Sequence, residues 1–435
     1  MAIQTLSARE LAAATPDSRD RYMDLLRVFS LATVVLGHWL MVVLVRGADG
    51  EVRADNALGI LPGLQPLTWV FQVMPLFFFV GGFAHAGALR RAPGYAEFVR
   101  GRAARLLIPT AAFAAVWLVV GLLIELTGHD SGLLRTATRL IGQPLWFVGV
   151  YLGVVALAPV MWALHRRFGI AVPVLLVAGV AGVDLVRFGL GHTEFGLVNV
   201  ALVWLAVHQL GFLYADGRLG RRAGGALAIG GLAAAVALVT FGPYPLSMVG
   251  MPGAAVSNMS PPTAALMAHA LWLIGAAVLL RNSISRVLAR PRVWLAVVAA
   301  NGVAMTAFLW HLTALFLVSG VQLALGSAGP TVGSALWWLS RPIELSLFAA
   351  VTAVLIALFR RMDRPRELVR APLPTSRAAF GMILCLAGVL GISAAGFGGA
   401  LSGRAAPLLM FEVTPLRCVI LLAAGAVLLR LRTAR

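Results

Sequence analysis

The first strongly apolar stretch of the chain carries ionisable residues at a spacing suited to proton transfer. In the segment RYMDLLRVFSLATVVLGHWLM, His38 follows Arg27 by eleven residues. On an α-helix these side chains fall within about 20° of one face and about 16 Å apart along the axis. Asp24 lies near that face, one turn before Arg27. Polar groups in hydrocarbon are costly and usually face a cavity or a partner. Because imidazole exchanges protons near neutral pH, this stripe of three ionisable residues along one helix face predicts a catalytic site formed by His38, Arg27 and Asp24.

The segments that would position this stripe are too apolar for a water-soluble protein. Of the 435 residues, 60% are hydrophobic and 12% are charged, against roughly 25% charged in soluble domains. A helix needs about twenty apolar residues to span a bilayer. The pattern predicts an all-α integral membrane protein, a polytopic bundle of about twelve transmembrane helices. The predicted spans are 25–46, 66–89, 105–126, 144–164, 168–188, 196–214, 224–241, 262–280, 300–324, 335–359, 378–398 and 412–430.

The arginines give the predicted orientation. The chain carries a net charge of +18 without a single lysine. Its arginines form short runs between apolar segments, whereas a nucleic-acid site gathers them on one face, so we exclude nucleic acid as a partner. Most of them fall in alternate loops, which predicts a multi-pass protein of a bacterial cytoplasmic membrane with both termini in the cytoplasm. Arg187 is one of the few expected on the opposite side. The first twenty residues are polar and predict a cytoplasmic tail, not a cleavable signal.

Several motifs in order resemble the membrane acyltransferase-3 family. An arginine, ten residues and a histidine in the first span are similar to a hallmark of that family. PLFFFVGGF at 75–83, PLWFVGVYL at 144–152 and AFLWHLTALF at 307–316 resemble three further segments, with Gly81 and Phe308 where serine and tyrosine are commonest. Arg102 and Arg105 resemble its paired arginines. FRRMDRP at 359–365 resembles its closing motif, with Asp363 in place of glutamate.

The resemblance implies both a domain plan and an activity. It implies a ten-helix acyltransferase core over 21–366, after the tail 1–20 and before a cytoplasmic linker 367–377 and an extra transmembrane pair in 378–435. Members of the family transfer acyl groups, often acetyl, to hydroxyl acceptors. We expect acyl-CoA, most commonly acetyl-CoA, as donor, and a carbohydrate, glycolipid or secondary metabolite as acceptor. Arg102 and Arg105 would bind the phosphates of the donor.

The sequence leaves the mechanism and several further residues open. His38 would act as a general base or form a transient acyl-histidine. His311 and Asp363 are further candidates for the site, and His85 is expected to reach toward the membrane surface. No histidine shows metal-ligand spacing, so no metal is expected.

Two rival functions and one loop also stay open. Twelve helices also suit a secondary transporter, although the two halves show no matched pair of helices broken by Gly or Pro. A polyprenyl-linked glycosyltransferase is a further alternative, although the first outer loop shows no recognisable acidic pattern. The uncharged loop 242–262 either caps a cavity or serves as a connector.

Overall fold

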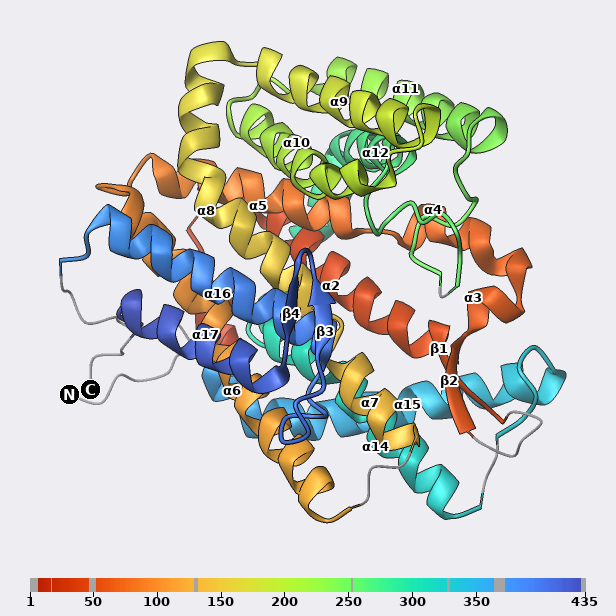
Figure 1. Cartoon of the computed structure of the whole chain (residues 1–435). Helices are drawn as coiled ribbons and strands as arrows, with labels where there is room; N and C mark the ends of the chain where they lie inside the picture. Colours follow the sequence, from red (N-terminus) through yellow and green to blue (C-terminus); the bar gives the residue numbers. More distant parts are fainter. Residues whose placement is uncertain are drawn as a thin grey trace. The chain divides into compact units, whose positions relative to one another are not determined.

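The computed structural model describes residues 7–16, 18–46, 52–128, 132–251, 253–326, 329–363 and 372–431 (Figure 1). The chain is 76% helical with almost no sheet. Within the described ranges, eleven helical segments are long and apolar enough to cross a membrane. The predicted all-α polytopic membrane fold is therefore confirmed.

Eleven of the twelve predicted spans correspond to these segments, although the helix of the first, 25–46, ends at Met41 where a strand begins. The last predicted span is shorter than predicted. The segment 412–430 contains helix α17 (Pro415–Leu428), which has 14 residues and is about 21 Å long, less than the bilayer's hydrocarbon thickness. Strand β4 (Phe411–Val413) occupies the beginning of the predicted span, and Thr414 caps α17 by accepting a hydrogen bond from the Arg417 amide. The apolar run therefore belongs to two elements, which composition alone does not separate.

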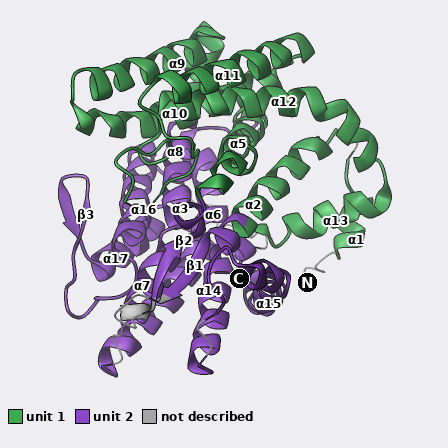
Figure 2. Ribbon diagram, turned by 90° about the vertical axis from the view of Figure 1, so that its right-hand side faces the viewer, with its two compact units in different colours: residues 1–36, 62–90, 160–304 green, residues 37–61, 91–159, 305–435 purple. Residues whose placement is uncertain are grey.

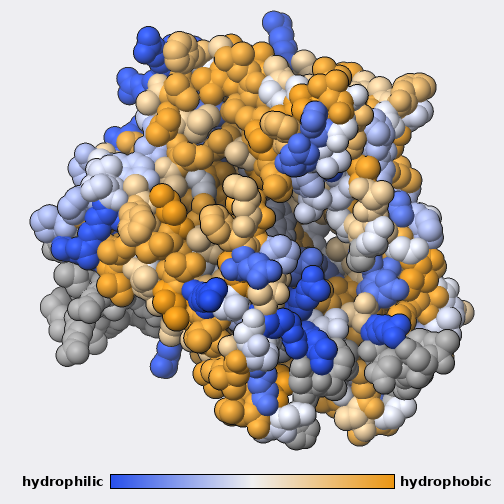
Figure 3. All heavy atoms as spheres, in the orientation of Figure 1, coloured by the Kyte–Doolittle hydropathy of each residue, from blue (hydrophilic) through white to orange (hydrophobic). Residues whose placement is uncertain are grey.

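The surface of the helices is apolar, as a protein dissolved in lipid requires. On the face shown in Figure 3, hydrophobic side chains make up most of the surface, and hydrophilic ones form separate patches. Large apolar side chains that point outward include Ile229, Phe241 and Leu339. Lipid contact explains this exposure, which would be costly in water.

The chain forms two compact units, each assembled from separate stretches of sequence (Figure 2). Unit 1 comprises residues 1–36, 62–90 and 160–304, and unit 2 comprises residues 37–61, 91–159 and 305–435. The boundaries predicted from sequence, 1–20, 21–366, 367–377 and 378–435, stay predictions, and 364–371 lie outside the described residues.

Unit 1 is built from helices alone over its described residues, apart from one isolated bridge in a loop. It holds most of α2 (Arg21–Met41) and the C-terminal part of α8 (Leu145–Phe168). Its other elements are α1 (Ala8–Ala13), a 3-10 helix (Pro62–Leu67), α4 (Thr68–Phe71), α5 (Met74–Leu89), α9 (Ala171–Asp184), a π-helical turn (Leu185–Gly189), a 3-10 helix (Thr193–Leu197), α10 (Val198–Ala215), α11 (Arg221–Phe241), α12 (Ala264–Leu288) and α13 (Pro291–Asn301).

The loop 242–262 of unit 1 is fixed by hydrogen bonds. The Trp69 indole donates to the Leu246 carbonyl, and the Gln72 amide donates to the Met248 carbonyl. Asn258 donates to the carbonyls of two residues of the same loop. Residues 246–248 of this loop are thus held against α4 and its C-cap residue Gln72, and whether the loop caps a cavity stays a prediction.

Helices α11 and α12 pack with their backbones in close contact. A Cβ added to Gly231 would lie 2.5 Å from the Trp272 amide nitrogen and 2.7 Å from the Ala268 carbonyl oxygen. At the neighbouring Gly230 nothing lies within 4 Å of the same position. Gly231 is therefore needed for the close contact between α11 and α12, and Gly230 is not.

We expect Gly231→Ala to destabilise the protein by about 1–3 kcal/mol, because the helices must separate to admit the methyl group. Gly230→Ala should stabilise it by about 0.5–1 kcal/mol, because alanine favours a helix and meets nothing. Thermal unfolding of the two detergent-solubilised variants measures the difference. Equal melting temperatures would contradict the close contact.

Unit 2 contains the end of α2, the rest of α8 and two short hairpins. The first hairpin pairs β1 with β2, and the second pairs β3 with β4. Its remaining elements are β1 (Val42–Arg46), β2 (Val52–Asn56), α3 (Ala57–Ile60), α6 (Tyr95–Leu126), α7 (Gly132–Gly142), α14 (Ala304–Ala324), α15 (Ala335–Phe359), a 3-10 helix (Arg360–Met362), α16 (Thr375–Ala395), β3 (Ala406–Leu408), β4 and α17.

Candidate active site

His38 lies near the C-terminal end of α2 and contacts a second histidine. Its Nδ1 is 2.9 Å from Nε2 of His311 on α14, and the two rings stack with centroids 5.0 Å apart. Both residues belong to unit 2. His311 is fully buried, whereas His38 is half-buried. The structure thus brings together two of the residues that the sequence singled out separately.

The hydrogen bonds of the pair fix which nitrogen of His38 is left unprotonated. Nδ1 of His311 lies 2.5 Å from the Phe308 carbonyl oxygen, which can only accept, so this nitrogen carries the hydrogen. In a neutral ring Nε2 of His311 is then an acceptor, and it must receive the Nδ1 hydrogen of His38. The remaining nitrogen, Nε2 of His38, keeps its lone pair and makes no hydrogen bond to any described residue. It is therefore a proton acceptor in the tautomer that the network selects.

A second hydrogen bond joins the same two helices. The indole nitrogen of Trp39, the residue after His38, donates to the His311 carbonyl oxygen at 3.0 Å. Consecutive residues of α2 therefore contact the side chain and the backbone of one residue of α14. This double contact restricts the rotation of the His38 ring.

Aromatic side chains from three other segments of unit 2 hold α14 around His311. Phe147 packs edge-on against Phe308 with centroids 5.3 Å apart. Trp310 stacks on Phe359 at 4.0 Å. Trp117 donates a hydrogen bond to Thr313. Phe147 and Phe359, which come from the motifs that begin at 144 and 359, thus both pack against the motif 307–316 on this helix.

Asp363 contacts the beginning of α14 and not the histidine pair. Its Oδ2 accepts a hydrogen bond from the Thr306 amide at 2.9 Å. Burial raises the pKa of this carboxyl group, and the bond from Thr306 opposes the rise. A carboxylate at the N-terminus of a helix complements the helix dipole. Asp363 therefore contacts the first turn of the helix that carries His311, and its part in the site stays a prediction.

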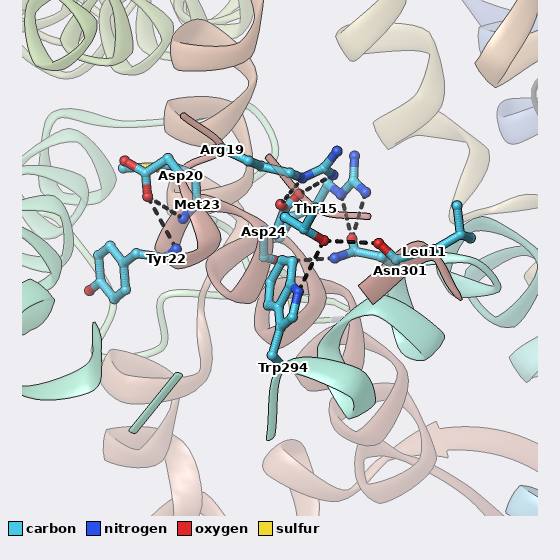
Figure 4. Close-up of polar contacts among 10 residues, drawn as sticks. Leu11, Thr15, Arg19, Asp20, Tyr22, Met23, Asp24, Trp294 and Asn301 are labelled. Carbon is cyan, nitrogen blue, oxygen red and sulfur yellow. Dashed lines mark hydrogen bonds and ion pairs between the residues drawn. The ribbon is translucent and has the colours of Figure 1, made fainter. Parts of the chain in front are cut away.

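Arg27 and Asp24 belong to unit 1, where a different network holds them. Figure 4 shows the part of this network around Arg19, Asp24 and Asn301. The Arg27 guanidinium donates to Oδ1 of Asn301 from Nε at 2.8 Å and from Nη2 at 2.5 Å. The carboxylate of Asp24 accepts two hydrogen bonds from Arg19, at 2.6 and 2.9 Å. The Asn301 amide also lies 3.4 Å from the Asp24 carbonyl oxygen. Sequence reasoning missed Asn301, because this partner lies 274 residues from Arg27.

Arg27 and His38 share one continuous helix, as their spacing predicts. They belong to different units, so their joint action in one site stays a prediction.

Arg102 and Arg105 lie near the start of α6 in unit 2. This helix begins at Tyr95, ten residues before the predicted span, so both arginines are helical and one turn apart. Arg105 is exposed and Arg102 is partly exposed. Guanidinium groups in this arrangement are able to bind phosphate, and their role in donor binding stays a prediction.

His85, His208 and His269 lie in unit 1. His85 does not reach the surface as expected, because it is buried and its Nδ1 lies 2.9 Å from Nε2 of His208 in unit 1. His269 bonds to the Trp69 carbonyl oxygen at 2.8 Å. Over the described part of the chain, no group of three His, Cys, Asp or Glu side chains is arranged to hold a metal ion.

Comparison with known families identifies the class of protein. A family model of an acyltransferase domain, the acyltransferase-3 model, matches residues 20–361. The chain belongs to the acyltransferase-3 family. It is thus a membrane acyltransferase, and the match includes both histidines of the pair. No curated protein and no solved structure matches the chain.

Proposed function

We propose that this acyltransferase moves an acyl group, with acetyl the expected one, from acyl-CoA to a hydroxyl group of a carbohydrate, a glycolipid or a secondary metabolite. His38 is the general base of the transfer. The observation that carries the proposal is the chain of hydrogen bonds from His38 through His311 to the Phe308 carbonyl. This chain leaves Nε2 of His38 as an acceptor, which is what a base requires.

In this reaction the acyl group moves directly from the sulfur atom of CoA to the hydroxyl oxygen of the acceptor. The acceptor oxygen attacks the thioester carbonyl carbon while Nε2 of His38 takes the hydroxyl proton. The carbon–sulfur bond then breaks, the ester remains on the acceptor, and the CoA thiolate recovers the proton from His38. Atoms and charge balance without a metal or a redox partner.

His311 assists by holding the correct tautomer of His38. When Nε2 of His38 takes a proton, the ring becomes a cation whose Nδ1 hydrogen still points at Nε2 of His311. A hydrogen bond from a charged donor is stronger than one from a neutral donor. The pair therefore stabilises the protonated base more than the resting base, and this difference lowers the barrier.

An acyl-histidine intermediate uses the same lone pair as a nucleophile. The two routes differ in what accumulates when no acceptor is present. Direct transfer leaves the enzyme unmodified, whereas the covalent route places the acyl group on His38. Rapid quenching followed by mass spectrometry of the peptide that contains His38 separates them, and we expect no acyl adduct.

The proposed function is tested by following both the thioester and the acyl group in membranes. Vesicles containing the protein should consume radiolabelled acetyl-CoA and place the label on an extractable acceptor. A secondary transporter, the alternative that the helix count leaves open, would accumulate a substrate without loss of thioester. Accumulation without thioester cleavage would overturn the proposal.

Arg102 and Arg105 supply the phosphate contacts of the donor in this proposal. We expect Arg102→Ala and Arg105→Ala each to raise the KM for acetyl-CoA about tenfold with little change in kcat, because each removes a charge-assisted hydrogen bond. Steady-state kinetics in membranes measures both constants. Arg222→Ala, at another exposed arginine near the start of a helix, is the matched control. An unchanged KM in both test variants would contradict the assignment.

A further inference from the structure

Arg187 is a buried arginine whose charge no described residue neutralises by a direct bond. It lies in the π-helical turn that follows α9 in unit 1 and is 7% exposed. Its Nη1 is fully buried without a hydrogen-bond partner. No hydrogen bond or ion pair links the side chain to the rest of the described chain. A buried charge without a partner is costly, and most of all inside a membrane.

Asp184, the acid that interacts electrostatically with Arg187, forms no hydrogen bond or ion pair with it, and both of its oxygens accept from other described residues. Oδ1 of Asp184 accepts from the Asn199 amide at 2.9 Å. Oδ2 accepts from the Tyr244 hydroxyl at 3.0 Å and from the Ala264 amide at 2.7 Å. Asp184 therefore caps α12 and fixes the loop before it. It interacts with Arg187 only through space.

The guanidinium is held in place by its neighbours. A Cβ on Gly196 would lie 3.2 Å from both Cδ and Nε of Arg187 and 2.8 Å from the Pro261 ring. The guanidinium carbon also lies 4.6 Å from the centroid of the Phe188 ring. The side chain is thus packed into a fixed direction, so a ligand would meet a preorganised donor.

A second polar atom of the same network is also unsatisfied. Oδ1 of Asn199 is buried without a hydrogen-bond partner, while Nδ2 of the same amide binds Asp184. Exchanging the two amide atoms does not resolve this, because the oxygen would then face the Asp184 carboxylate. Two atoms near Asp184 therefore lack a hydrogen-bond partner among the described residues. They are the donor Nη1 of Arg187 and the acceptor Oδ1 of Asn199.

We propose that Arg187 and Asn199 form a binding site for a hydroxyl-bearing anion, such as a sugar acid or a sugar phosphate. Arg187 donates to an anionic oxygen, and Asn199 accepts from a hydroxyl group of the same ligand. An anion satisfies the buried guanidinium more fully than a neutral ligand. The proposal concerns binding alone, so it stands or falls separately from the histidine pair of unit 2.

The test is ligand-dependent stability of the purified full-length protein in detergent. The probes are glucuronate and glucose 1-phosphate, which carry both hydroxyl groups and a negative charge. Glucose, which has no charge, and acetate, which has no hydroxyl group, are the control compounds. A ligand that binds only the folded state raises the melting temperature in a saturable way. We expect such a rise with glucuronate or glucose 1-phosphate, and a smaller one or none with glucose or acetate at the same concentration.

Arg187→Ala should abolish the rise without lowering the ligand-free melting temperature, because it removes a buried charge that has no bonded partner. The matched control is Arg341→Ala, since Arg341 is half-buried but forms an ion pair with Glu344 at 2.5 Å. That variant should melt lower than the wild type and keep the response to the anions.

Three results would overturn the proposal. The wild type shows no saturable rise with either anion, the rise survives in Arg187→Ala, or Arg187→Ala lowers the ligand-free melting temperature as far as Arg341→Ala does. If Arg187→Ala does not fold, Arg187→Gln takes its place, and the anion-induced rise in melting temperature is compared between that variant and the wild type.

Discussion

Replacing His38 by alanine will lower kcat for acyl transfer by about 10²–10⁴-fold, the usual contribution of a general base. The expectation follows from the position of Nε2, the one ring nitrogen of the His38–His311 pair that the hydrogen bonds leave as a free acceptor. Alanine removes this acceptor and leaves α2 and its neighbours in place. Release of CoA from acetyl-CoA in membranes, with an acceptor extract present, measures kcat.

The structure provides a close control for this variant. His208 and His85 form a second pair with the same 2.9 Å separation between ring nitrogens, in unit 1. His208→Ala removes a buried interhelical hydrogen bond, so it should lower stability while kcat per folded molecule stays close to that of the wild type. Wild-type turnover by His38→Ala, or equal loss in the two variants, would mean that His38 is not the base.

The length of the apolar runs predicted the fold well, because the bilayer forces each apolar run of about twenty residues to be helical. It failed at the last span, where β4 and α17 divide one apolar run. It also placed the start of α6 ten residues too late, since a helix can continue beyond the hydrocarbon layer with charged residues such as Arg102 and Arg105.

The candidate site was predictable in part. The position of His38 followed from the helical period, and the motif at 307–316 pointed to His311. Their mutual contact was not predictable, because it depends on how α2 and α14 pack across 273 residues of sequence. The same reason hid Asn301, the partner of Arg27, and the hydrogen bond from Trp39 to the His311 backbone. A single sequence specifies which groups are available, and tertiary packing decides which of them meet.

His311→Leu should lower kcat by about 10–100-fold and leave the KM for acetyl-CoA unchanged. In metal sites, losing the group that orients a histidine has an effect of this size. Leucine cannot accept the Nδ1 hydrogen of His38, so the His38 ring is free to populate the other tautomer, in which Nε2 carries the hydrogen and cannot act as a base. Steady-state kinetics separates this effect on kcat from an effect on donor binding.

His311→Gln distinguishes orientation from packing, because the glutamine amide oxygen is able to accept the same hydrogen. We expect this variant to recover a large part of the activity that His311→Leu loses, at a similar melting temperature. Trp39→Phe is the complementary control, since it removes only the hydrogen bond to the His311 backbone and leaves the imidazole contact intact. If glutamine and leucine lower kcat equally, His311 serves packing alone, and the tautomer of His38 must be fixed by the substrate. The histidine pair would then lose its place in the mechanism, even if His38 proved essential.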